Sequence, residues 1–142
     1  MRVEEFLDKF EEKVLKAHGY SYRKKQREII RFAINSLESG KENVLINAPP
    51  GIGKTVVNYA VALYFYLNYG YTTLYTTPQI PLLDQIERDP LLNVAVIKGR
   101  DNYPCLVEPG KTAANGRCVR DRRFKCVYDC PYRIAKMKAL DH

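Results

Sequence analysis

The sequence predicts an α/β fold in which a parallel sheet is flanked by helices. Three runs rich in apolar or β-forming residues support this prediction, at residues 44–46, 71–76 and 93–97. A helical pattern at residues 56–67 separates the first run from the second. A strand–helix–strand order implies parallel strands, because only a crossover connection brings the second strand back in the same direction.

Composition limits the class of protein. The chain has 142 residues, of which 46% are hydrophobic, enough for one domain with a modest core. Its longest apolar segment, residues 56–67, contains Asn58 and several tyrosines and is too short to span a bilayer. The first residues have neither the basic start nor the apolar centre of a signal peptide. We therefore expect a cytoplasmic protein without a membrane partner, associated with the nucleoid if the source is prokaryotic.

Four helices are predicted from apolar periodicity. The first runs from Val3 to Ala17 and stops at His18 and Gly19. The second covers about residues 23–37 and ends before Ser39 and Gly40. The third and fourth cover residues 56–67 and 80–88.

A Pro/Gly-rich turn follows the first predicted strand and reads A-x-x-G-x-G-K-T from Ala48 to Thr55. Glycines let backbone N–H groups close around phosphate oxygens, and the next helix adds its partial positive charge. Lys54 would reach the β- and γ-phosphates and Thr55 would bind Mg²⁺, so these two are the candidate catalytic residues. Ala48 stands where the usual pattern has its first glycine. ATP and Mg²⁺ are the expected cofactors, with candidate binding residues Pro50, Gly51, Ile52, Gly53, Lys54 and Thr55.

A second nucleotide-binding signal precedes the predicted phosphate loop. Arg23 and Gln26 lie at the start of the second helix, a little over twenty residues before the loop. A glutamine amide offers both a donor and an acceptor, which is what the N6 and N7 edge of adenine requires. Gln26 is therefore a candidate adenine-binding residue, although an exposed glutamine at a helix start is often only solvated.

The balance of basic and acidic residues changes at about Lys98. Residues 1–97 carry 12 Lys/Arg and 11 Asp/Glu, whereas residues 98–142 carry 11 Lys/Arg and 5 Asp/Glu. Six of the seven net positive charges thus belong to the last third. Such a local excess indicates contact with a polyanion such as nucleic acid, and a solvated basic surface is the alternative. We predict two domains, 1–97 for nucleotide binding and 98–142 as a basic, cysteine-rich region.

All four cysteines lie in the second of these regions, as Cys105, Cys118, Cys126 and Cys130. A phosphate loop belongs in a reducing cytosol, where clustered cysteines more often bind metal than form disulfides. Only the last two have the close spacing usual for structural zinc, and a four-thiolate iron–sulfur cluster is less strict in spacing. Spacing alone leaves zinc and iron–sulfur open.

Five motifs occur in a fixed order along the chain. They are Tyr22-Arg23 with Gln26, Ala48 to Thr55, Leu74 to Gln79, Lys98 to Cys105 and Cys130-Pro131-Tyr132. Together they resemble the start of an XPD/DinG-like superfamily 2 DNA helicase, and the resemblance covers nearly the whole chain. It implies a partial RecA-like lobe with a C-terminal insert that binds a 4Fe-4S cluster through the four cysteines. It also implies ATP-driven 5′→3′ movement on single-stranded DNA, and it favours iron–sulfur over zinc.

The chain departs from that family at its end. Asp141 and His142 come before any Asp-Glu-Ala-His box and before a second lobe. We therefore expect the N-terminal portion of a DNA repair or replication helicase. The expected partners are single-stranded or forked duplex DNA, and a second chain that supplies the missing lobes.

Two other classes stay open at this stage. The first is a non-enzymatic module, in which a phosphate-loop scaffold with bound zinc or iron–sulfur only binds nucleic acid. The second is a small phosphate-loop kinase with a zinc lid. The family that the motifs resemble hydrolyses ATP, but the sequence does not decide whether this chain alone does so.

Overall fold

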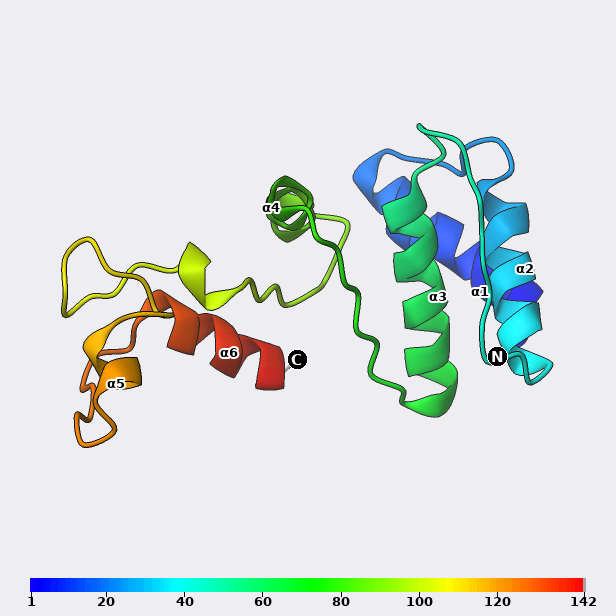
Figure 1. The fold of residues 1–142 in the computed structure, drawn as a ribbon. Helices are drawn as coiled ribbons and strands as arrows, with labels where there is room; N and C mark the ends of the chain where they lie inside the picture. The colour runs from blue at the N-terminus through cyan, green and yellow to red at the C-terminus, as the bar shows by residue number, and fades with distance from the viewer. Residues whose placement is uncertain (142) are drawn as a thin grey trace. The chain divides into compact units, whose positions relative to one another are not determined.

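The computed structural model describes residues 1–141 and divides them into two compact units (Figure 1). The first unit consists of Met1–Thr76 and Pro90–Leu92. The second consists of Thr77–Asp89 and the described residues from Asn93 onward. The predicted phosphate loop lies in the first unit, and all four cysteines lie in the second.

Three helical segments build the first unit. Helix α1 (Val3–Phe10) continues through a π-helical turn, η1 (Glu11–Leu15), and a 3₁₀ turn, η2 (Lys16–His18). Helix α2 spans Gln26–Glu38 and helix α3 spans Lys54–Tyr69. These helices confirm the first three predicted ones, with α2 beginning three residues late and α3 extended by two residues at each end.

The core of the first unit lies where these helices meet. Each helix contributes apolar residues spaced three or four apart, which places them on one face. The buried cluster consists of Phe6, Leu7, Phe10, Leu15, Ile30, Ile34, Val57, Ala60, Tyr64 and Leu91. Tyr64 packs edge-on against Phe6 with ring centroids 5.2 Å apart, and its hydroxyl donates to Glu38 Oε1 at 2.6 Å. The core therefore fixes α3, whose first residues follow the phosphate loop, against α1 and α2.

The second unit contains less regular structure. Helix α4 spans Ile80–Arg88, as predicted, followed by a 3₁₀ turn, η3 (Arg100–Asn102), and a four-residue helix, α5 (Arg117–Arg120). Helix α6 (Pro131–Asp141) was not predicted. Tyr103 and Tyr132 pack edge to face with centroids 5.6 Å apart, which joins the segment after η3 to the start of α6.

The predicted parallel sheet is wrong for this structure. Between residues 1 and 141 the only β-type pairing is an isolated antiparallel bridge between Pro104 and Thr112, so no RecA-like sheet is described. All three predicted strands are coil, and Leu45 and Leu74 in the first two are 96% and 83% exposed. The physical reason is that a helix closes its hydrogen bonds within itself, whereas a strand needs a partner from elsewhere. An apolar, β-branched run indicates an extended backbone but cannot supply that partner.

The apolar segment that the sequence places at residues 56–67 forms the middle of α3. This helix has 16 residues, fewer than the roughly 20 that a hydrocarbon core requires. Of the helices in residues 1–141, none has the length and apolar character needed to cross a membrane.

Candidate nucleotide and nucleic-acid site

The predicted phosphate loop forms a tight turn that leads directly into α3. Ala48, at the position of the missing first glycine, is 7% exposed and anchors the start of the loop in the protein. Gly51 and Gly53 have φ angles of +83° and +78°, which are left-handed conformations that glycine adopts without steric cost. The first helical hydrogen bond runs from the Val57 N–H to the Gly53 carbonyl at 3.1 Å. The glycines therefore allow the chain to turn sharply and enter the helix.

The N-terminus of α3 is open to an anion. Its cap residue is Gly53, so no side chain caps the free N–H groups of the first turn, and no acidic residue occurs there. Lys54 is the first residue of the helix and is exposed, while Thr55 beside it is half-buried. Free amides, the helix dipole and a lysine point charge together suit a phosphate group. The structure thus brings the two candidate catalytic residues to a helix N-terminus, and their chemical roles stay predictions.

Gln26 contacts the loop from α2. Its side chain is 2% exposed, and its amide nitrogen donates to the carbonyls of Ile52 at 3.1 Å and Gly53 at 3.3 Å. Its oxygen accepts from the Arg23 backbone N–H at 3.2 Å. In this arrangement the amide is directed at the loop, and the reading of adenine by Gln26 stays a prediction.

Arg23 makes a further contact with the same loop. Its guanidinium Nη1 donates to the Gly51 carbonyl at 2.6 Å, and the residue is otherwise exposed. Sequence reasoning grouped Arg23 with Gln26 from their distance to the loop, and the structure brings both against it. Reasoning from sequence missed Lys25, which lies between them with φ +66°, a left-handed conformation uncommon for residues other than glycine.

Charge pairs on the facing sides of α1 and α2 hold α2 in place. Glu4 and Asp8 are one turn apart on α1, and Arg27 and Arg31 are one turn apart on α2. Arg27 Nη2 lies 3.0 Å from Glu4 Oε2 and 2.7 Å from Asp8 Oδ1, and Arg31 also binds Glu4. Hydrogen bonds from Arg31 and then Arg27 lower the pKa of Glu4 from 4.5 to about 2. Because Arg27 directly follows Gln26, these pairs also position the start of α2.

Replacing Glu4 by glutamine should make the melting temperature of the protein depend less on pH. The folded-state pKa of Glu4 is depressed, so its ion pairs stabilise the protein above pH 4.5 and are lost as the pH falls toward about 2. Glu4 is 58% exposed, so the effect should be small and weakened by salt. Melting temperatures from pH 2 to 6 should show a gap between wild type and Glu4→Gln that closes at low pH. Glu12→Gln is the control, and a gap that persists at pH 2 would exclude this explanation.

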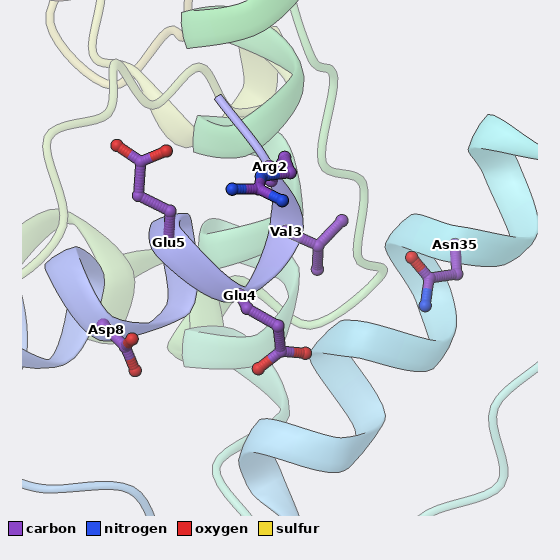
Figure 2. Close-up of a pocket in the computed structure, with 6 residues that line it drawn as sticks. All are labelled: Arg2, Val3, Glu4, Glu5, Asp8 and Asn35. Atoms are coloured by element: carbon purple, nitrogen blue, oxygen red, sulfur yellow. The ribbon is translucent and has the colours of Figure 1, made fainter.

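A surface pocket of about 590 Å³ lies beside α1 and α2 and is not a suitable phosphate site (Figure 2). Figure 2 shows that five of its lining residues come from α1 and the residue before it, and that Asn35 comes from α2. Three of the six, Glu4, Glu5 and Asp8, are acidic. Their charge would repel a triphosphate, so the loop before α3 is the better candidate.

The four cysteines do not form a metal site as described. All are free thiols, and nowhere in residues 1–141 do three His, Cys, Asp or Glu side chains gather as ligands. Cys118 is exposed, the Cys126 thiol donates to the Tyr128 carbonyl at 3.7 Å, and Cys105 Sγ packs against Gly116. The present arrangement therefore does not fit a cluster, and the thiols would have to move together to bind one.

The basic residues between Lys98 and Lys125 that lie near the cysteines in the sequence include both paired and unpaired side chains. Lys98 pairs with Asp84 and Glu87, lowering the pKa of Asp84, and Arg120 pairs with Glu108 at 2.5 Å. Within the described part of the chain, no ion pair involves five others, which are Arg100, Arg117, Arg122, Arg123 and Lys125. Arg100 lies over the Tyr132 ring at 5.1 Å, and Arg117 over Phe124 at 4.8 Å. These five cations are available to phosphates, as are Lys111, Lys136 and Lys138, which also make no ion pair within the described residues.

Comparison with known proteins agrees with the nucleotide site. Residues 19–101 match the family model described as type III restriction enzyme, res subunit. The match includes Arg23, Gln26 and the whole loop before α3, and it covers more than half of the chain. No curated protein and no solved structure matches the chain. The chain therefore belongs to the type III restriction enzyme res subunit family, a superfamily 2 group of helicase-like, ATP-dependent enzymes that act on nucleic acid.

Proposed function

We propose that this chain forms the ATP-binding part of a DNA helicase that moves 5′→3′ on DNA. The observation that carries the proposal is the loop before α3, with two left-handed glycines, an uncapped helix N-terminus and Lys54. Residues 1–97 would form the nucleotide-binding part and residues 98–142 the DNA-binding part. The XPD/DinG-like assignment rests on the motif order in the sequence.

The residues of the loop would act on ATP in distinct ways. The amides at the start of α3 would bind the β-phosphate, and Lys54 would add a point charge between the β- and γ-phosphates. The Thr55 hydroxyl would hold Mg²⁺, which supplies charge neutralisation of the phosphates when bound. Isothermal titration with Mg²⁺–ATP tests this directly. Micromolar or tighter binding is expected, and no detectable binding at millimolar nucleotide would refute the proposal.

A 4Fe-4S cluster held by the four cysteines is the second part of the proposal, with zinc as the alternative. It is supported by the clustering of every cysteine within residues 105–130. That segment contains only a four-residue helix and one isolated bridge, and its buried residues are Ala113 and Gly116. So small a core orders a segment poorly, and ligand bonds would add the missing stability.

Single-stranded DNA, alone or at a fork, is the proposed partner of the basic second unit. Neutralisation of phosphates makes the affinity for single strands fall with salt by a slope of about −0.7 per contact. Contacts by Arg100, Arg117, Arg122, Arg123 and Lys125 would give a slope of about −3.5. Fluorescence anisotropy with an oligonucleotide at several salt concentrations measures it.

Arg122→Ala should flatten that slope by roughly 0.7, the share of one phosphate contact. Lys98→Ala is the matched control and should change the slope little, because Lys98 already pairs with Asp84. Equal effects of the two variants would show that the cations listed above do not form the DNA surface.

A further inference from the structure

Two carboxylates of α4 hold the Lys98 side chain, which is 17% exposed. Asp84 is the close partner, and its carboxylate accepts a hydrogen bond from the Lys98 ammonium group. Glu87 is more distant, with its Oε2 3.8 Å from Lys98 Nζ, and it is 57% exposed, against 38% for Asp84. Asp84 therefore makes the main contact between α4 and the segment that begins at Lys98.

Tyr103 connects Lys98 to three other segments of the second unit. Its hydroxyl accepts a hydrogen bond from the Lys98 backbone N–H at 3.0 Å, and its carbonyl accepts one from the Ala113 N–H at 2.8 Å. Its ring packs edge to face against Tyr132 of α6, with centroids 5.6 Å apart. The ion pair of Asp84 with Lys98 thus lies at one end of a set of contacts that joins α4, η3, residue 113 and α6.

The segments joined by these contacts carry exposed cations that make no ion pair within the described residues. These cations are Arg100, Lys111, Lys136 and Lys138. Arg100 belongs to η3 and lies over the Tyr132 ring at 5.1 Å, so its position depends directly on α6. Side chains that are ordered before a ligand arrives lose less entropy when they bind it.

We propose that Asp84 is a positioning residue for DNA, which binds Lys98 and thereby orders η3 and α6 so that their cations are in place for phosphates. The inference rests on the proposed function, since it assumes that single-stranded DNA binds the second unit. It predicts an effect opposite in sign to that of net charge. Removing a carboxylate from a basic region strengthens DNA binding if charge alone decides the affinity. Loss of the ordering should weaken it instead.

Fluorescence anisotropy with a single-stranded oligonucleotide, at several salt concentrations, tests this sign. Asp84→Ala should lower the affinity about three- to fivefold at every concentration, which corresponds to one partly exposed ion pair. The slope with salt should not change, because the same cations still neutralise phosphates in the complex. Glu87→Ala is the matched control, since it removes a carboxylate from the same helix, and it should not weaken binding. Tighter binding by Asp84→Ala, or equal losses in both variants, would overturn the proposal.

Exchanging the two charges separates the ion pair from other effects of position 84. Asp84→Lys alone brings two cations together and should weaken binding, although it raises the net charge. Asp84→Lys combined with Lys98→Asp restores an ion pair and the wild-type net charge, so its affinity should return to within about twofold of wild type. An exchanged variant that binds no better than Asp84→Lys alone, with circular dichroism confirming that both are folded, would overturn the proposal.

Amide hydrogen exchange in the DNA-free protein measures the ordering itself. The N–H groups of Lys98, Asn102 and Tyr103 are all hydrogen-bonded, so exchange at residues 98–103 reports on this segment. Asp84→Ala should speed that exchange about fivefold, and Glu87→Ala should not. Faster exchange with unchanged DNA affinity in Asp84→Ala would refute this inference alone. Failure of wild type to bind the oligonucleotide even at low salt would instead refute the proposed DNA partner.

Discussion

Replacement of Lys54 by alanine is expected to lower the affinity for Mg²⁺–ATP by roughly 10- to 100-fold. Lys54 is the first residue of α3 and is exposed at the end of the loop, so its ammonium group can reach the phosphates. A charge-assisted hydrogen bond contributes about 1.5–3 kcal/mol, and each 1.4 kcal/mol is tenfold in affinity. Isothermal titration measures the loss. Lys41→Ala, which removes an exposed lysine outside the loop, is the matched control and should bind normally.

Thr55→Ala distinguishes the contribution of the metal to ATP affinity from that of the direct phosphate contacts, in the same assay. It should weaken binding when Mg²⁺ is present and have little effect in EDTA, because its hydroxyl is proposed to hold the metal. Lys54→Ala should lose affinity under both conditions. If Lys54→Ala bound ATP as wild type does, the loop before α3 would not be the phosphate site.

Replacement of Cys118 by serine is expected to remove the bound metal and to expose residues 105–130 to protease. The segment buries little of its own surface, so the proposed ligand bonds would provide the free energy that orders it. Anaerobic purification followed by iron, sulfide and zinc analysis measures the metal content. Four irons and four sulfides per chain are expected for wild type, with far less in Cys118→Ser.

The control for this prediction is Val119→Ser, which alters the exposed neighbour and keeps all four thiols. It should retain its metal and its protease resistance. Full metal content in Cys118→Ser would contradict the four-cysteine site. One zinc in place of iron and sulfide would keep the cysteine ligands and replace the proposed cluster with its alternative.

Helices were predictable from this sequence because their signals are local. Apolar spacing located α1, α2 and α3, and α4 was predicted with its observed ends. Helix α6 was missed because its apolar residues are spread over two opposite faces. Ile134, Met137 and Leu140 form an exposed stripe, and Tyr132, Ala135 and Ala139 lie partly buried on the other side. The prediction of a sheet was wrong for the opposite reason, because strand pairing depends on residues that are distant in sequence.

The residues of the candidate nucleotide site could be listed from the sequence, but their geometry could not. Glycine and lysine spacing identified the loop, and an amide at a fixed distance before it identified Gln26. Nothing in the sequence says that this amide faces the loop carbonyls, since that depends on how α2 packs beside the loop. The pairing of Lys98 with Asp84 was missed for the same reason, because it joins residues 14 positions apart.

Amide hydrogen exchange with and without Mg²⁺–ATP locates the nucleotide on the chain most directly. ATP at about three times the wild-type Kd should slow exchange in peptides that cover residues 51–57 and residues 23–27, and should leave residues 105–130 unchanged. Lys54→Ala at the same nucleotide concentration should show little slowing. Unchanged exchange of the loop in wild type, or equal slowing in Lys54→Ala, would contradict the assignment of this loop as the ATP site.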